Sequence, residues 1–469
     1  MFYGREKELS TMQKKYDNNS FECIIIYGRR RVGKTALINT FCKDKKTIYF
    51  SALETTAKEN LKTLSKAIHF ATTDAPVYES YDHAFQAITD LTKEERLIFV
   101  IDEYPYLAKC DTSISSRIQH FIDHQWEHSK LYLILCGSSM SFMENQVLGY
   151  QSPLFGRRTA QFKITAMTYK EMTAFHPSLS NDEQALLYGI TGGVPHYINK
   201  LQVKNNITTA LIENLFDTSS YLFEEPDNLL KQELREPAIY NSIIKAIADG
   251  SSKLNQISTK SGLETSKCTK YLSTLIGLGI IKKETPITEK IGKKTIYRIE
   301  DNFFRFWYRF VPSNISAIHS DTIAKVYPQT IEPFFSNYMG LIFEKMCKDY
   351  LLRYTNHLPI ILSDLGSWWG TDKVEKKEVE IDIIGTPASG NEYIIASCKF
   401  RNEKIGVDEL MLLQKYAHVF GKGSKYHYYI FSKSGFTKEL LELSHNQEVY
   451  LLTLDDLYVT IQPQAELLD

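Results

Sequence analysis

Short apolar runs alternate along the first third of the chain with longer stretches whose apolar residues recur at helical spacing. The runs at 22–27, 47–51, 97–101 and 131–136 have the length and composition of buried strands. Strands that alternate with helices favour a mostly parallel sheet covered on both faces. Residues 1–167 are therefore predicted to form one α/β domain.

The pattern changes beyond this domain. Residues 168–232 show helical spacing with short polar breaks, which predicts a helical lid. Residues 233–315 predict three short helices and a β-hairpin, the order of a winged helix-turn-helix. Residues 330–469 begin a second α/β pattern. Its predicted elements are a helix near 333–355, strands near 359–363, 378–385 and 392–399, a helix near 407–420 and a strand at 426–431.

Composition narrows the classes of protein that this chain can represent. The 469 residues are 43% apolar and 24% charged, with a net charge of −1, so any nucleic-acid surface must be a local patch. Without a signal peptide or a long apolar run, we expect a cytoplasmic chain with no membrane span. The seven cysteines form no C-x-x-C pair, which argues against a zinc ribbon.

A glycine-rich loop directly follows the first predicted strand and precedes a helical segment. Its pattern, G-x-x-x-x-G-K-T, allows backbone N–H groups to curve around phosphates at a helix N-terminus. We expect Lys34 to reach the β- and γ-phosphates of ATP and the Thr35 hydroxyl to ligate Mg²⁺. The predicted phosphate-binding residues are Gly28, Arg29, Arg30, Arg31, Val32, Gly33, Lys34, Thr35 and Ala36.

Two carboxylates end the strand at 97–101 and supply the second part of a nucleotide site. Asp102 is expected to hold Mg²⁺, directly or through water, and Glu103 to act as general base toward the attacking water. Ser138, after the strand at 131–136, is a candidate to lie beside Asp102 and contact the γ-phosphate. The alternative for Ser138 is a helix N-cap.

Two consecutive arginines, Arg157 and Arg158, are candidates for an arginine finger. A guanidinium that reaches the γ-phosphate stabilises charge in the transition state, here across a subunit interface of a homo-oligomer. The alternative is a plain surface pair.

Five motifs together resemble a known family, the archaeal-type ATPases of the STAND branch of AAA+ proteins. In chain order they are Tyr3-Gly4-Arg5-Glu6-x-Glu8-Leu9, the glycine-rich loop, Ile101-Asp102-Glu103, Gly137-Ser138-Ser139 and Thr191-Gly192-Gly193-Val194-Pro195. The resemblance implies that Gly4 and Arg5 lie near the adenine and that Pro195 marks the lid near the nucleotide. It also implies that the protein acts more as a nucleotide-driven switch than as an enzyme with fast ATP turnover.

A helix near 114–128 carries His120, His124 and His128 at spacings of four. These imidazoles would share one helix face, as metal ligands do, and Glu127 could join them. Because one straight helix cannot close a tetrahedral site, we favour a polar helix face.

The predicted winged helix is a candidate for binding double-stranded DNA. Its third helix presents Ser266, Lys267 and Lys270 at the start, and the Lys290–Lys294 turn would form a lysine-rich wing against phosphates. The alternative is a surface that docks a partner protein.

The last domain resembles the PD-(D/E)XK nucleases and the domain of unknown function that ends many of these ATPases. Asp382 and Lys399 match the nuclease pattern, but Ser397 occupies the glutamate position. A hydroxyl is a weak Mg²⁺ ligand beside a carboxylate, so nuclease activity is in doubt. Glu344 and Glu380 could partly compensate.

Three functions stay open at this point. The first is an ATP-hydrolysing switch coupled to a DNA-binding module. The second is an ATP-gated, Mg²⁺-dependent nuclease, and the third is a scaffold or signalling protein that binds ATP and barely hydrolyses it.

Overall fold

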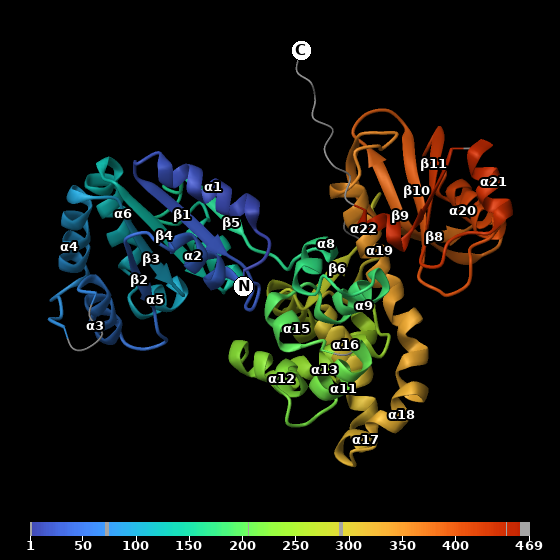
Figure 1. The fold of residues 1–469 in the computed structure, drawn as a ribbon, viewed down its shortest axis with the longest axis horizontal. Coiled ribbons are helices and arrows are strands. Elements are labelled where there is room, and N and C mark those ends of the chain that lie inside the picture. The colour runs from blue at the N-terminus through green and yellow to red at the C-terminus, as the bar shows by residue number, and fades with distance from the viewer. Residues whose placement is uncertain (1, 71–74, 205, 290–293, 447, 460–469) are drawn as a thin grey trace. The chain divides into compact units, whose positions relative to one another are not determined.

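The computed structural model describes residues 2–70, 75–204, 206–289, 294–446 and 448–459. It divides into two compact units (Figure 1). Unit 1 comprises residues 1–167 with 194–196, and unit 2 comprises residues 168–193 with 197–469. No helix in the described ranges is both long enough and apolar enough to cross a bilayer.

Unit 1 is built on a five-stranded sheet of order β2-β3-β4-β1-β5, in which all pairs are parallel. β1, β3 and β4 are buried along their whole length because helices cover both faces of the sheet. Alternate residues of β1 enter different cores: Ile25 packs in one and Ile24 in the other. The strands are β1 (Glu22–Tyr27), β2 (Thr47–Ser51), β3 (Leu97–Asp102), β4 (Leu131–Gly137) and β5 (Ala160–Lys163).

The helices of unit 1 lie between these strands, as the alternating pattern predicted. They are α1 (Glu6–Asp17), α2 (Lys34–Cys42), α3 (Ala57–Ile68), α4 (Tyr81–Glu94), α5 (Tyr104–Cys110), α6 (Ile114–His124) and the one-turn α7 (Met140–Phe142). The register pairs Tyr27 with Gly137 and Ile101 with Leu135, so the carboxyl ends of β1, β3 and β4 lie together. The edge strand β5 was not predicted, because it has only four residues and no buried side chain.

The prediction of one long histidine helix at 114–128 was wrong. α6 ends at His124, and His128 lies in a separate 3₁₀ turn, Trp126–His128. Trp126 is fully buried and its indole N–H donates to Thr89 Oγ1 at 2.9 Å, which draws the chain off the helix axis. The described residues contain no group of three or more histidine, cysteine or acidic side chains suited to a metal ion.

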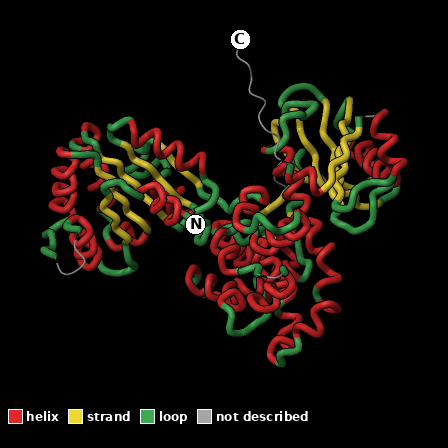
Figure 2. The backbone as a smooth tube through the Cα atoms, viewed as in Figure 1, coloured by secondary structure: helices red, strands yellow, loops and turns green. Residues whose placement is uncertain are grey.

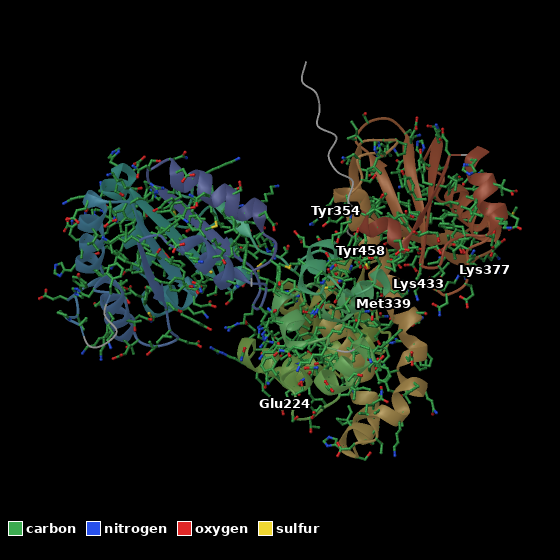
Figure 3. The ribbon with its side chains drawn as sticks, in the orientation of Figure 1. Glu224, Met339, Tyr354, Lys377, Lys433 and Tyr458 are labelled. Atoms are coloured by element: carbon green, nitrogen blue, oxygen red, sulfur yellow. The ribbon has the colours of Figure 1, made fainter. Side chains whose placement is uncertain are left out.

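Unit 2 begins with helices, as predicted, and continues with three helices and a hairpin. Tyr169 of α8 packs between Tyr354 and Tyr458, which Figure 3 labels, at ring-centroid distances of 5.6 and 5.2 Å. The helices are α8 (Tyr169–Met172), α9 (Asn181–Thr191), α10 (Pro195–Lys200), α11 (Ile207–Leu215), α12 (Tyr221–Glu233), α13 (Pro237–Ala248), α14 (Leu254–Ser261) and α15 (Thr265–Gly277). The antiparallel pair β6 (Ile281–Glu284) and β7 (Ile296–Ile299) follows.

Residues 302–353 form a further set of helices that pack on this core. Residues 315–330, where a domain boundary was expected, contain the whole of α17 and α18. The Tyr338 hydroxyl, on α19, donates to the carbonyl oxygens of Gly189 (2.7 Å) and Asn302 (3.0 Å) and so ties α19 to α9 and α16. The helices are α16 (Asn302–Phe310), α17 (Ile315–His319), α18 (Ile323–Thr330) and α19 (Phe335–Arg353).

A second five-stranded sheet, of order β12-β11-β10-β9-β8, completes unit 2 (Figure 2). β8, β9 and β10 pair antiparallel, and β10, β11 and β12 pair parallel. The elements are β8 (Leu362–Asp372), β9 (Lys377–Pro387), β10 (Glu392–Lys399), α20 (Val407–Phe420), β11 (Lys425–Ser432), α21 (Lys438–Asn446), β12 (Val449–Thr453) and α22 (Leu454–Tyr458).

The sequence placed β9, β10, α20 and β11 correctly but misplaced β8 and did not predict α21, β12 or α22. β8 includes Trp368 and Trp369, which the sequence placed outside any strand. Across β8 and β9 the register shifts: Gly366 pairs with Ile384, whereas Trp368 pairs with Ile381. This irregularity lies at Asp382, and a bulge of this kind re-aims the side chains beside it.

Candidate functional site

The glycine-rich loop connects β1 to α2 in a conformation that its glycines make possible. A Cβ on Gly28 would collide with the backbone carbonyl oxygen of Ile164, so only glycine fits there. Gly33, the N-cap of α2, has φ of 92°, and Arg31 has φ of 73°. Left-handed backbone at these two positions curves the loop and directs the chain into the N-terminus of α2.

Lys34 occupies the centre of this loop. Its ammonium donates to the carbonyl oxygens of Gly28 and Arg29, both at 2.9 Å, and only 7% of the residue is exposed. Burial lowers the pKa of Lys34, and the nearby carboxylates of Asp102 and Glu103 oppose that shift. A lysine held in this way places its positive charge where phosphate oxygens meet the loop N–H groups.

Asp102, at the end of β3, accepts hydrogen bonds from three donors. Its Oδ2 accepts from the Tyr49 hydroxyl of β2 at 2.6 Å and from the Thr35 hydroxyl of α2 at 3.3 Å. Its Oδ1 accepts from the Glu103 N–H at 3.0 Å. A buried carboxylate beside a hydroxyl provides the hard oxygen donors that Mg²⁺ prefers, so these residues fit the ion that was expected here. Tyr49 was not predicted, because nothing in its local sequence marks it.

Glu103 lies one residue beyond the strand, with φ of 52°, at the N-cap of α5. Its Oε2 accepts from the Ser138 hydroxyl at 2.9 Å. The structure therefore places Ser138 against Glu103, whereas we expected it beside Asp102. Gly137 makes this approach possible, since a Cβ there would lie 2.7 Å from Met143 Sδ and 2.8 Å from Pro105 Cδ.

The two candidate finger arginines differ in their surroundings. Arg157 donates from Nε and Nη2 to the two carboxylate oxygens of Asp123, both at 2.7 Å, and also to the carbonyls of Pro153 and Phe155. Arg158 is half-buried and forms no hydrogen bond or ion pair with any residue that the structure describes.

Residues expected near the adenine and the lid also lie at this end of unit 1. Gly4 and Arg5 both have positive φ, and Arg5 donates to the carbonyl of Thr165. Pro195 lies against the loop, 3.8 Å from the Cβ position of Gly33, and the N–H of His196 donates to Arg31 O at 3.4 Å.

A parallel α/β sheet with a phosphate-type loop after β1 and a buried aspartate at the end of β3 is the arrangement of a P-loop ATPase domain. Residues 2–201 match the family model described as an ATPase domain predominantly from Archaea. Residues 307–410 match a model described as archaeal and bacterial proteins of unknown function.

The chain is also similar to archaeal proteins along much of its length. The chain is 34% identical over 407 residues to an uncharacterized protein of Methanocaldococcus jannaschii, covering 86% of this chain and 88% of that one. It is 50% identical over 46 residues to an uncharacterized ATP-binding protein of the same organism, covering 10% of this chain and 78% of that protein. The chain therefore belongs to the same family as this Methanocaldococcus jannaschii protein, and it joins an archaeal-type ATPase domain to the domain of unknown function.

A solved structure has a similar fold. The Walker-type ATPase of Pyrococcus abyssi matches with a TM-score of 0.52 at 19% identity, covering 66% of this chain and 96% of that one. Family membership implies nucleotide binding, usually with Mg²⁺.

The second candidate site lies on the C-terminal sheet. Asp382 Oδ2 accepts from the Cys398 N–H at 2.7 Å and lies 3.5 Å from Lys399 Nζ. The predicted pair is thus brought together. Ser397 does not stand alone: its hydroxyl donates to Glu409 Oε1 at 2.7 Å, and the same oxygen lies 3.3 Å from Lys399 Nζ.

Glu409 is the residue that the sequence analysis missed. It lies in the first turn of α20 and is largely buried, so the helix supplies a carboxylate at the place where the strand has a hydroxyl. The two predicted helpers lie differently. Glu380 is half-exposed and pairs with Arg298 at 3.2 Å, whereas Glu344 faces Asp382 without a hydrogen bond to any described residue.

Proposed function

We propose that this chain is an ATP-hydrolysing molecular switch of the AAA+/STAND type, coupled to DNA. The convergence of Lys34 and Thr35 after β1 with Asp102 and Glu103 at the end of β3 carries the proposal. Lys34 would bind the β- and γ-phosphates, while Thr35 and Asp102 would hold Mg²⁺, which neutralises charge on the phosphates.

Glu103 has the position of the general base in this reaction. Its carboxylate would accept a proton from the attacking water, and Ser138 orients it by the 2.9 Å hydrogen bond. Gly4, Arg5 and Pro195 would enclose the base of the nucleotide. Movement of the helical segment 168–232 with nucleotide occupancy would then present or hide other surfaces of the chain.

The replacement Lys34→Ala tests the enzyme assignment. We expect it to abolish steady-state ATP turnover and to weaken ATP binding, since it removes the buried charge at the centre of the loop. Lys43→Ala, which changes an exposed lysine at the other end of α2, is the matched control and should leave both unchanged. Unchanged turnover in Lys34→Ala with a folded protein would rule out this site as the ATPase centre.

DNA binding is assigned to the three-helix and hairpin module, which has the element order of a winged helix. On α15, Cys268, Leu272 and Leu275 are buried, while Ser266, Lys267 and Lys270 are exposed. These lysines would contact phosphates. Of the predicted wing, residues 290–293 lie outside the described residues, and Lys294 pairs with Glu289 at 2.5 Å.

Fluorescence anisotropy with duplex DNA across a salt series tests this assignment. Two lost phosphate contacts in a Lys267→Ala/Lys270→Ala variant should lower the slope of log affinity against log salt by about 2. Lys245→Ala on α13 is the control, because it removes an exposed lysine from a different helix of the module. An unchanged slope in the double variant would point to a protein-docking role instead.

A Mg²⁺-dependent nuclease is the second candidate function, and Glu409 is the observation that favours it. Asp382 and Glu409 place two carboxylates on either side of Lys399, which restores the charge that Ser397 lacks. Two carboxylates do not fill the coordination shell of Mg²⁺, so water and substrate phosphate would complete it. Lys399 would orient the attacking water.

Glu409→Gln separates this candidate from simple packing. We expect it to weaken Mn²⁺ binding to the C-terminal site by calorimetry and to remove cleavage of duplex DNA, while Asp408→Asn, one residue earlier and exposed, changes neither. Both measurements use an Asp102→Asn background, which removes the proposed Mg²⁺ ligand of the ATP site, so that this site does not dominate the metal binding. Equal Mn²⁺ binding in the two variants would contradict the assignment.

A further inference from the structure

A charged cavity of about 110 Å³ lies in unit 2, and Glu344 of the second candidate site is among the residues that line it. Its walls come from the hairpin strands β6 and β7, from α16 and α19, and from Ser367 of β8. The volume exceeds what a single water needs by several-fold, so the cavity is large enough for a polyatomic ligand.

Several cations on the wall are neutralised by their neighbours. Lys282 lies 2.6 Å from Glu284 and 3.1 Å from Glu300, and Lys345 lies 2.8 Å from Glu300. Arg298 lies 3.1 Å from Glu284. The pair between Lys345 and Glu300 joins α19 to the end of the hairpin. Together these ion pairs engage both glutamates on the hairpin side of the cavity, Glu284 and Glu300.

Two further cations on the wall are not neutralised in this way. The Arg305 guanidinium forms no hydrogen bond or ion pair with any residue in the described ranges. Its Cζ lies 5.9 Å from the centroid of the Tyr338 ring. Lys348 donates only to a neutral group, the Ser367 hydroxyl, at 2.8 Å. Burial lowers the pKa of Arg305, and the residue is partly exposed at the cavity wall.

We propose that this cavity binds a phosphate-class oxyanion between Arg305 and Lys348. A guanidinium presents several N–H donors in a planar fork that matches two oxygens of a phosphate, and charge-assisted bonds of this kind are strong when both groups are desolvated. The anion would supply the partner that Arg305 lacks. The site is independent of ATP hydrolysis and of DNA binding by α15.

The same chemistry could come from two sources: a free phosphate ion, or the terminal phosphate of a nucleic-acid strand. A cavity of this volume admits a terminal group more readily than a continuous backbone. The nucleic-acid source would bring a strand end near Asp382, because Glu344 lines the cavity and is close enough to that carboxylate for their charges to interact.

The test measures binding to the full chain carrying Lys34→Ala, so that the ATP loop does not bind the probe. Calorimetry with inorganic phosphate, and anisotropy with 5′-phosphorylated and 5′-hydroxyl oligonucleotides of one sequence, separate the two sources. Arg305→Met should weaken phosphate binding at least about tenfold. Arg309→Met, one helical turn later and exposed with its guanidinium 3.0 Å from Asn337 Oδ1, is the matched control and should bind as the parent does.

A preference for the 5′-phosphorylated strand that Arg305→Met removes assigns the nucleic-acid source, whereas equal binding of both strands with phosphate binding intact assigns the free ion. If phosphate binds equally to Arg305→Met and Arg309→Met, or neither probe binds the parent, the proposal is wrong.

Discussion

Replacing Tyr49 by phenylalanine removes one hydroxyl from the proposed Mg²⁺ site and leaves every other group in place. That hydroxyl donates to Asp102 Oδ2 at 2.6 Å, the same oxygen that the Thr35 hydroxyl approaches at 3.3 Å. Burial, together with the hydrogen bond to Asp102, raises the pKa of Tyr49, so the phenol stays a donor at ordinary pH. Its role is to fix the orientation of the aspartate.

The expected size of the effect follows from this geometry. A hydrogen bond to a charged group contributes about 1.5–3 kcal/mol, and loss of an outer partner of a metal ligand typically costs about 10- to 100-fold in metal affinity. These two figures agree, since about 1.4 kcal/mol corresponds to tenfold. We therefore expect the Mg²⁺ concentration for half-maximal ATP turnover to rise by about tenfold or more in Tyr49→Phe.

A Mg²⁺ titration of ATP turnover at saturating ATP is the assay. Tyr132→Phe is the control, because it removes a buried hydroxyl from the neighbouring region of the sheet, where it donates to Met12 O at 3.1 Å, away from the site. Both variants lose one buried hydrogen bond, so loss of stability alone would affect them alike. An unchanged Mg²⁺ dependence in Tyr49→Phe would refute the view that Asp102 holds the ion.

Three further predictions follow from the structure. Gly28→Ala should prevent stable folding of unit 1 or abolish ATP binding, measured by thermal unfolding and nucleotide binding, because its Cβ would collide with the Ile164 carbonyl. Glu300→Gln should lower the free energy of unfolding by on the order of 3 kcal/mol near neutral pH. Burial raises the pKa of Glu300, but Lys345 and Lys282 outweigh that effect and hold it at about 2 against an ordinary 4.5, so the difference from the parent should vanish as the pH falls from 4.5 to 2. Arg158→Ala should slow ATP hydrolysis more than Arg157→Ala, since Asp123 already engages Arg157; the reverse order would assign the finger to Arg157.

The ATPase half of the fold could be predicted from the sequence because its strands are uniformly apolar and its motifs follow them directly. Asp102 and Glu103 end β3, and Lys34 and Thr35 begin the helix that the glycine-rich loop joins to β1; parallel pairing brings these strand ends together. Tyr49 could not be predicted, because its contact with Asp102 depends on the register of β2 against β3.

The C-terminal half was harder to predict for a physical reason. Its sheet is mixed, and β8 carries glycines and polar residues that weaken the apolar alternation on which strand prediction depends. Glu409 lies ten residues beyond Lys399 on a helix, and only folding α20 over the sheet brings its carboxylate to Ser397 and Lys399. Ser397 made nuclease activity doubtful because β10 itself lacks the expected glutamate, and the carboxylate that contacts Ser397 comes from α20.

Single-turnover ATP hydrolysis by the parent chain and by Glu103→Gln, with ATP affinity measured in parallel, tests the central claim most directly. The parent should convert bound ATP to ADP in a Mg²⁺-dependent reaction. Glu103→Gln should bind ATP with similar affinity but hydrolyse it about 10²- to 10⁴-fold more slowly, because it removes the general base and leaves Lys34 and Asp102 in place. Hydrolysis at the same rate in both proteins, or none in the parent with and without duplex DNA, would contradict the account.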